Sequence, residues 1–91
     1  MAARTPTRLW AAMIGGRAHA LYNVANVTTS DTVDIGSTGT GDFAKVFFVS
    51  ATADIEGTLA TAEMTAATNI TVTTSSLTGE TVLLLVIGAA L

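Results

Sequence analysis

The sequence predicts an all-β fold, a small antiparallel β-sandwich or barrel-like domain that follows an extended N-terminal arm with a short helix. Three observations support this prediction. Threonine, a β-branched residue that favours strands, is about one residue in five. Apolar and polar residues alternate in several short stretches, and Gly, Ser and Asp separate these stretches. The amino-acid composition changes near residue 20, so we divide the 91 residues into an arm, 1–20, and a β-sandwich domain, 21–91.

The arm contains the pattern of a short helix. Thr5 is a suitable capping residue, Pro6 suits the first helical position, and Gly15 would end the helix. The apolar residues of this segment are spaced four apart and would share one face: Leu9, Trp10, Met13 and Ile14. A helix of about two turns is not stable alone in water, so we expect this face to dock on another surface.

The domain contains a series of short candidate strands. We expect strands at residues 21–27, 32–35, 43–51, 53–59, 69–74 and 81–87, and leave residues 60–68 as a loop or a weak strand. Residues 43–51 are apolar on both faces, which predicts a central strand with Phe43, Phe47 and Val49 on one side. Residues 53–59 alternate between apolar and polar side chains, as in a strand with one face in water.

The last expected strand is the best sequence evidence for an interface. Leu83, Leu85 and Ile87 alternate with a second apolar set, so both faces of this strand are apolar. A strand in a small sandwich has only one interior face. The second face therefore needs cover, from the arm or from another subunit.

Composition also favours assembly. Only 12% of the residues are charged, against about 25% in an ordinary soluble domain. The chain has no cysteine and so no disulfide to reinforce a small core. We therefore expect a homo-oligomer, with a trimer favoured. The longest apolar run, residues 82–91, is about half of the roughly 20 residues that a membrane helix needs, so we expect no membrane association.

Charge is distributed unevenly along the chain. All three arginines lie in the first twenty residues, and all seven acidic residues lie at or after Asp31. Such a basic arm is suited to lie on another surface. The pI near 4.6 and the lack of a basic, aromatic-lined face argue against a nucleic-acid partner.

No residue pattern indicates catalysis, a cofactor or a metal site. The single histidine, His19, lies in the arm, and the domain has one lysine, Lys45, so a nucleophile with its base cannot be assembled from this domain. The glycine-rich stretch Gly36–Asp42 lacks the lysine of a phosphate loop, and the aspartates match no calcium-loop spacing. We therefore expect a protein that is not an enzyme.

Two stretches carry a resemblance to a known class of proteins. Ala20-Leu21-Tyr22-Asn23-Val24, followed by Ala44-Lys45-Val46-Phe47-Phe48-Val49-Ser50-Ala51-Thr52-Ala53, resembles small tailed-phage virion proteins that have an N-terminal arm and a compact β-sandwich. Ala25 stands where many of those proteins have proline. The resemblance implies a non-enzymatic capsid decoration or cement protein, or a fibre subunit, located in the virion and bound to the major capsid protein or another virion protein.

The leading hypothesis is thus a structural protein of a virus particle. The residues expected to contact partners are Arg4, Arg8, Trp10, Met13 and Ile14 in the arm, and Leu83, Leu85 and Ile87 on an intersubunit face. One alternative is a subunit of a surface filament, in which the N-terminal segment completes a neighbour's sheet. Another is a module that binds sugar or calcium through the loop Gly36–Asp42.

Overall fold

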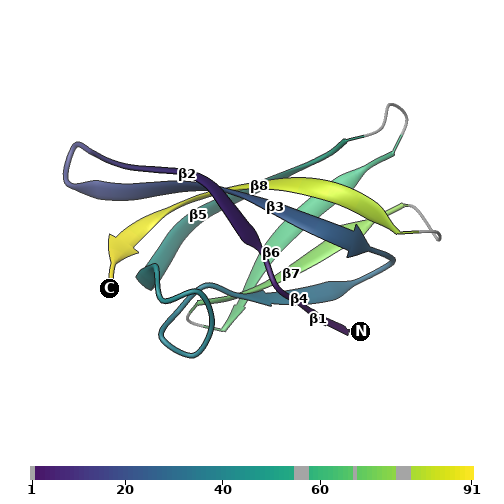
Figure 1. Ribbon diagram of the computed structural model, residues 1–91, viewed down its shortest axis with the longest axis horizontal. Helices are drawn as coiled ribbons and strands as arrows, with labels where there is room; N and C mark the ends of the chain where they lie inside the picture. Colours follow the sequence, from purple (N-terminus) through teal and green to yellow (C-terminus); the bar gives the residue numbers. More distant parts are fainter. Residues whose placement is uncertain (1, 55–57, 67, 76–78) are drawn as a thin grey trace.

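The computed structural model describes residues 2–54, 58–66, 68–75 and 79–91, and in them the chain is all-β. Two four-stranded sheets lie one above the other in a sandwich-like arrangement (Figure 1). The small sheet has the order β1-β4-β7-β6, and the large sheet has the order β2-β3-β8-β5. The strands are β1 (Ala2–Arg4), β2 (Thr7–Ile14), β3 (Arg17–Val27), β4 (Asp31–Asp34), β5 (Phe43–Ala53), β6 (Ala60–Ala66), β7 (Asn69–Thr74) and β8 (Glu80–Ala90).

The core lies between the two sheets and is made mainly of β-branched side chains. Where a strand pairs regularly, as β7 and β8 do, alternate residues point inward, because successive side chains of a strand face opposite ways. The buried apolar residues of the core include Ala20, Tyr22, Val24, Val27, Val33, Ile35, Phe43, Val46, Ile70, Val72, Val82, Leu84 and Val86. Each large side chain buried in this way contributes about 1.5–3 kcal/mol.

The N-terminal residues form strands, so the predicted helix is wrong. β1 pairs in parallel with β4, and β2 pairs antiparallel with β3. Gly15 and Gly16 have positive φ angles of 59° and 78°, which suit a two-residue hairpin turn. In this hairpin the backbone of β2 pairs with β3. In a two-turn helix, most backbone N–H and C=O groups would lack a partner, because they lie at the two ends. The expected boundary at residue 20 falls inside β3.

Strand β5 differs from its prediction in position and in side-chain direction. It lies at the edge of the large sheet, while β8 is central between β3 and β5. Pairing with β8 is irregular between Phe43 and Lys45 and again between Val46 and Phe48. These irregularities break the two-residue alternation, so the neighbours Phe47 and Phe48 are both exposed.

The remaining predicted strands agree with the structure to different degrees. Strand β7 has the predicted bounds, and the expected strands at 21–27 and 81–87 are parts of the longer β3 and β8. Residues 60–66, left open between loop and strand, form β6. Of the strand expected at 53–59, Ala53 ends β5, and residues 55–57 lie outside the described part of the chain.

Candidate interaction surface

Arg4 pairs with the buried Asp31 in a cluster that holds β1 on the small sheet. Its Nε atom donates to Asp31 Oδ2 at 3.0 Å, while the backbone amides of Ala2 and Thr28 donate to the same carboxylate at 3.0 and 3.1 Å. Burial would raise the pKa of Asp31, but these hydrogen bonds together with the Arg4 charge outweigh burial and lower it. Asp31 therefore stays ionised, and Arg4 serves the fold.

Arg8, in β2, is likewise paired with an aspartate of the same chain. Its Nη1 atom lies 2.8 Å from Asp42 Oδ1, and the Tyr22 hydroxyl donates to Asp42 Oδ2 at 2.6 Å. Burial raises the pKa of Tyr22, and the hydrogen bond to Asp42 raises it further. The phenol is thus a permanent donor at neutral pH, and the cluster fixes β2 and β3 to the loop before β5.

The glycine-rich loop directs its polar groups inward. The backbone amides of Gly39 and Gly41 both donate to the Gly36 carbonyl, at 3.0 and 2.8 Å. Asp34 accepts hydrogen bonds from the Thr38 hydroxyl and from the Gly36 amide, and these bonds lower the pKa of Asp34. The loop has the hydrogen bonds of a folded turn, and the amides of Gly39 and Gly41 do not form a cradle for an anion.

The outward side of the large sheet gathers the exposed apolar side chains. Trp10 pairs with Leu21, Leu21 pairs with Leu85, and Phe48 pairs with Ile87. Residues directly opposite each other in a sheet share a face, so these side chains lie together. We call this surface the outer apolar face; it comprises Trp10, Ile14, Leu21, Phe48, Leu83, Leu85 and Ile87.

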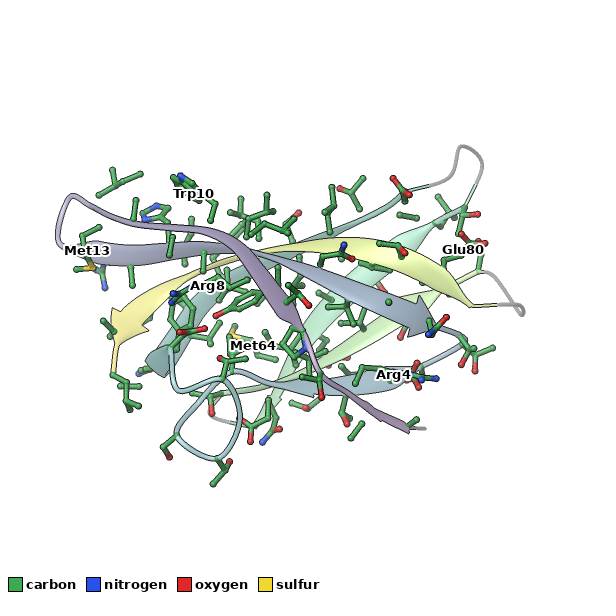
Figure 2. The ribbon with its side chains drawn as sticks, viewed as in Figure 1. Arg4, Arg8, Trp10, Met13, Met64 and Glu80 are labelled. Atoms are coloured by element: carbon green, nitrogen blue, oxygen red, sulfur yellow. The ribbon has the colours of Figure 1, made fainter. Side chains whose placement is uncertain are left out.

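No described segment covers the outer apolar face, since the small sheet packs on the opposite side (Figure 1). Figure 2 shows Trp10 above the large sheet, whereas Arg8 and Met64 point below it. Trp10 is 47% exposed and Phe48 is 48% exposed, and Leu85 on the central strand is half-buried by its neighbours. The same face also carries the polar residues His19, Asn23, Ser50 and Thr52. Trp10, Leu21 and Leu85 nevertheless lie side by side, and adjoining exposed apolar residues mark an interaction site more often than isolated ones do.

The outward side of the small sheet has the opposite character. Thr32 pairs with Thr71, which pairs with Glu63, and Thr61 pairs with Thr73. These side chains share the face opposite the buried Ile70 and Val72. One outer side of the sandwich is therefore polar and rich in threonine, and the other is apolar.

The two ends of the large sheet differ in charge. Arg17 lies over the ring of Phe47 at 4.5 Å, and the Lys45 ammonium lies 5.6 Å from the same ring. Asp54 is exposed at the far end of β5, where its amide donates to the Thr81 carbonyl. The end near the β2-β3 turn is thus basic, and the end where β5 stops carries a carboxylate.

The structure sorts the predicted contact residues into three groups. Trp10 and Ile14 join Leu83, Leu85 and Ile87 on one continuous face, although the sequence placed these residues on two separate surfaces. Met13 points to the other side of the β2-β3 hairpin, where it lines a cavity of about 290 Å³. Arg4 and Arg8 form ion pairs within the chain.

Sequence reasoning missed two members of the outer apolar face. Leu21 could have been found, because it alternates with the inward-facing Ala20 and Tyr22. Phe48 could not, because the irregular pairing of β5 hides which way its side chain points. The face is thus wider than the last strand alone indicated.

Comparison with known proteins finds no matching family model, no matching curated protein and no matching solved structure. Within the residues that the structure describes, no group of three His, Asp or Glu side chains is placed to hold a metal ion. The same residues contain no helix that is long and apolar enough to cross a membrane. The resemblance to virion proteins stays a prediction.

Proposed function

We propose that this chain is a non-enzymatic structural subunit of a virus particle, a capsid decoration, cement or fibre protein that assembles with copies of itself through the outer apolar face. The observation that carries this proposal is the contrast between the two outer sides of the sandwich. The threonine-rich side suits water, whereas the side with Trp10, Leu85 and Phe48 suits a partner.

The polar groups of the chain support a structural role. Asp31, Asp34 and Asp42 each accept hydrogen bonds from the chain itself, and these bonds fix strands and the glycine-rich loop. Tyr22, with its raised pKa, is a donor in the same network. These groups stabilise the fold, which leaves the apolar surface as the main feature available for contact with other molecules.

A second copy is the partner that the charges favour. When two large sheets stack face to face with their strands in opposite directions, the basic end of one copy lies over the carboxylate end of the other. Arg17 and Lys45 would then lie near Asp54 of the second copy. This complementarity selects the opposed orientation over the one that places like charges together.

The virion location and the capsid partner rest on the resemblance of residues 20–24 and 44–53. Tyr22 and Val24 of the first stretch are core residues, so this part of the resemblance concerns the fold. With Arg4 and Arg8 paired inside the chain, we assign the contacts of the N-terminal segment to Trp10 and Ile14.

The self-association is tested by the solution mass of the full chain, measured by light scattering at neutral pH. We expect an oligomer for the natural chain, and a folded species of smaller mass for Leu85→Glu, which places a charge in the outer apolar face. Thr73→Glu adds the same charge to the polar side and should leave the mass unchanged. Circular dichroism checks that both variants keep their strands. A monomeric natural chain at micromolar concentration would remove the proposal.

The virion location needs a separate measurement. Purified particles of the virus that encodes the chain should contain it at a fixed number of copies per particle, measured by quantitative mass spectrometry. Its absence from particles would overturn the virion assignment while leaving the self-association intact.

A further inference from the structure

We infer that the free edge of β2 pairs antiparallel with β2 of a second copy, about a twofold axis that passes between the Ala12 residues of the two copies. The inference rests on the proposed self-association and names a contact within it. It concerns the backbone edge of the large sheet at β2, whose outward side chains Trp10 and Ile14 also belong to the outer apolar face.

Three of the four sheet edges carry features that discourage pairing with another chain. β1 has only three residues, β5 is irregular at two places and carries Lys45, and β6 has an irregularity after Met64 and an exposed Glu63. Short strands, bulges and charges are the usual protection of an edge. β2 has none of these from Trp10 to Ile14, since its one irregularity lies before Trp10.

β2 is also the most exposed strand that the structure describes. Every residue from Thr7 to Ile14 is exposed except Ala12, which is half-buried. Met13 is 62% exposed and Leu9 is 52% exposed, although both are large apolar residues. A strand of this length and hydrophobicity with one side unpaired is a template for strand addition.

The backbone geometry fixes which residues of β2 face the free edge. The residues that flank a two-residue turn, here Ile14 and Arg17, form a hydrogen-bonded pair. Along antiparallel strands such pairs alternate with non-hydrogen-bonded pairs, whose backbone groups point away from the partner strand. The backbone groups of Ala11 and Met13 are then directed away from β3. They are the donors and acceptors that a second chain would use.

The side chains select the register. The outward residues of β2 are Trp10, Ala12 and Ile14, and they must meet outward residues of the second copy if the outer apolar face is to continue. Centred on Ala12, the pairing places Trp10 opposite Ile14 of the second copy, and the twofold axis repeats this contact. Aromatic and β-branched residues directly opposite each other are a favourable cross-strand pair.

The same register suits the backbone. Ala11 lies opposite Met13 of the second copy as a hydrogen-bonded pair, and the two Ala12 residues form the close, non-hydrogen-bonded pair on the axis. Alanine is small enough for this approach. The two large sheets join into one eight-stranded sheet, and their outer apolar faces become a single surface.

Cysteine cross-linking tests the contact directly, because the chain has no cysteine of its own. Ala12→Cys places one thiol on the expected axis, and Thr61→Cys places one on the exposed edge strand β6 as the matched control. Under mild oxidation at micromolar concentration we expect a covalent dimer from Ala12→Cys, with a yield about tenfold above that of Thr61→Cys, because the native contact raises the local thiol concentration.

A second variant tests the backbone. Ala11→Pro removes an amide that faces the free edge. An edge strand tolerates proline at such a position, because no hydrogen bond within the sheet is lost. Introduced with Ala12→Cys, it should reduce the cross-linked dimer to the level of Thr61→Cys, while circular dichroism shows that the strands remain.

The outcomes separate this inference from the proposed function. If the natural chain is an oligomer, a trimer included, but Ala12→Cys and Thr61→Cys cross-link equally, the β2 contact is overturned and the self-association stands. Undiminished cross-linking after Ala11→Pro also overturns it. A monomeric natural chain with no cross-linking overturns both.

Discussion

Replacing Trp10 with alanine tests whether the outer apolar face drives association. Trp10 is 47% exposed in the single chain. With a side-chain area of about 250 Å², covering the exposed part removes roughly 120 Å² from water, worth about 3 kcal/mol at ~25 cal/mol per Å². Alanine retains part of this area, so we expect a loss of about 2 kcal/mol, or about 30-fold in the dissociation constant, for each covered ring. A twofold dimer covers two rings, so its dissociation constant should rise by roughly 10³-fold.

Two independent signals report the effect. Sedimentation velocity over a dilution series gives the dissociation constants of the natural chain and of Trp10→Ala. Trp10 is the only tryptophan of the chain, so its fluorescence emission should shift to the blue as the natural chain assembles. Leu59→Ala is the control, because Leu59 is 75% exposed beside the small sheet, where its carbonyl accepts the Ser75 amide.

Either of two results would contradict a role for the Trp10 ring in association. The first is that Trp10→Ala associates as tightly as the natural chain, which would mean that the ring stays uncovered in the oligomer. Likewise, an emission maximum that does not move between monomer and oligomer would show that Trp10 remains in water, whatever the mass.

Three further predictions concern the fold and the forces of assembly. Asp31→Asn removes the buried partner of Arg4 and should lower the free energy of unfolding by about 3 kcal/mol in urea titrations at pH 7. Because folding lowers the pKa of Asp31, its contribution to the free energy of unfolding is complete above the unfolded pKa of about 4 and disappears as the pH falls through the folded pKa. The stabilities of the variant and the natural chain should therefore converge in acid. In Gly88→Ala, the new Cβ atom would overlap the Lys45 carbonyl oxygen, so denaturation should show a loss of about 1–3 kcal/mol in the free energy of unfolding. Molar NaCl should change the dissociation constant of the oligomer by less than about tenfold, because exposed ion pairs contribute about 0–1 kcal/mol; a larger weakening would assign the association to charge.

The sequence predicted the strand class well where alternation was regular. Asn69–Thr74 alternates without interruption, and the structure places β7 at the same residues. The N-terminal segment was misread because residues four apart, such as Trp10 and Ile14, share a face both in a helix and in a strand. The deciding feature was the turn at Gly15, which has a positive φ and joins β2 to β3.

The candidate site was predicted in part for a similar reason. The apolar second face of β8 was visible in the alternation of Leu83, Leu85 and Ile87, and the structure places these residues on one outward face. The roles of Arg4 and Arg8 were not visible, because their partners Asp31 and Asp42 lie 27 and 34 residues further along the chain. Such pairing depends on strand order, which local patterns do not determine.

The two arginine pairs change what the uneven charge distribution means. As a linear sequence, the chain has a basic N-terminus that is free to lie on an acidic partner. In the fold, the acidic groups that attract Arg4 and Arg8 belong to the same chain, so the attraction holds β1 and β2 on the body. With β2 in place, Trp10 and Ile14 extend the apolar surface of β8 across the whole large sheet. The electrostatic feature thus organises the subunit, and the hydrophobic face that it completes is what remains for assembly.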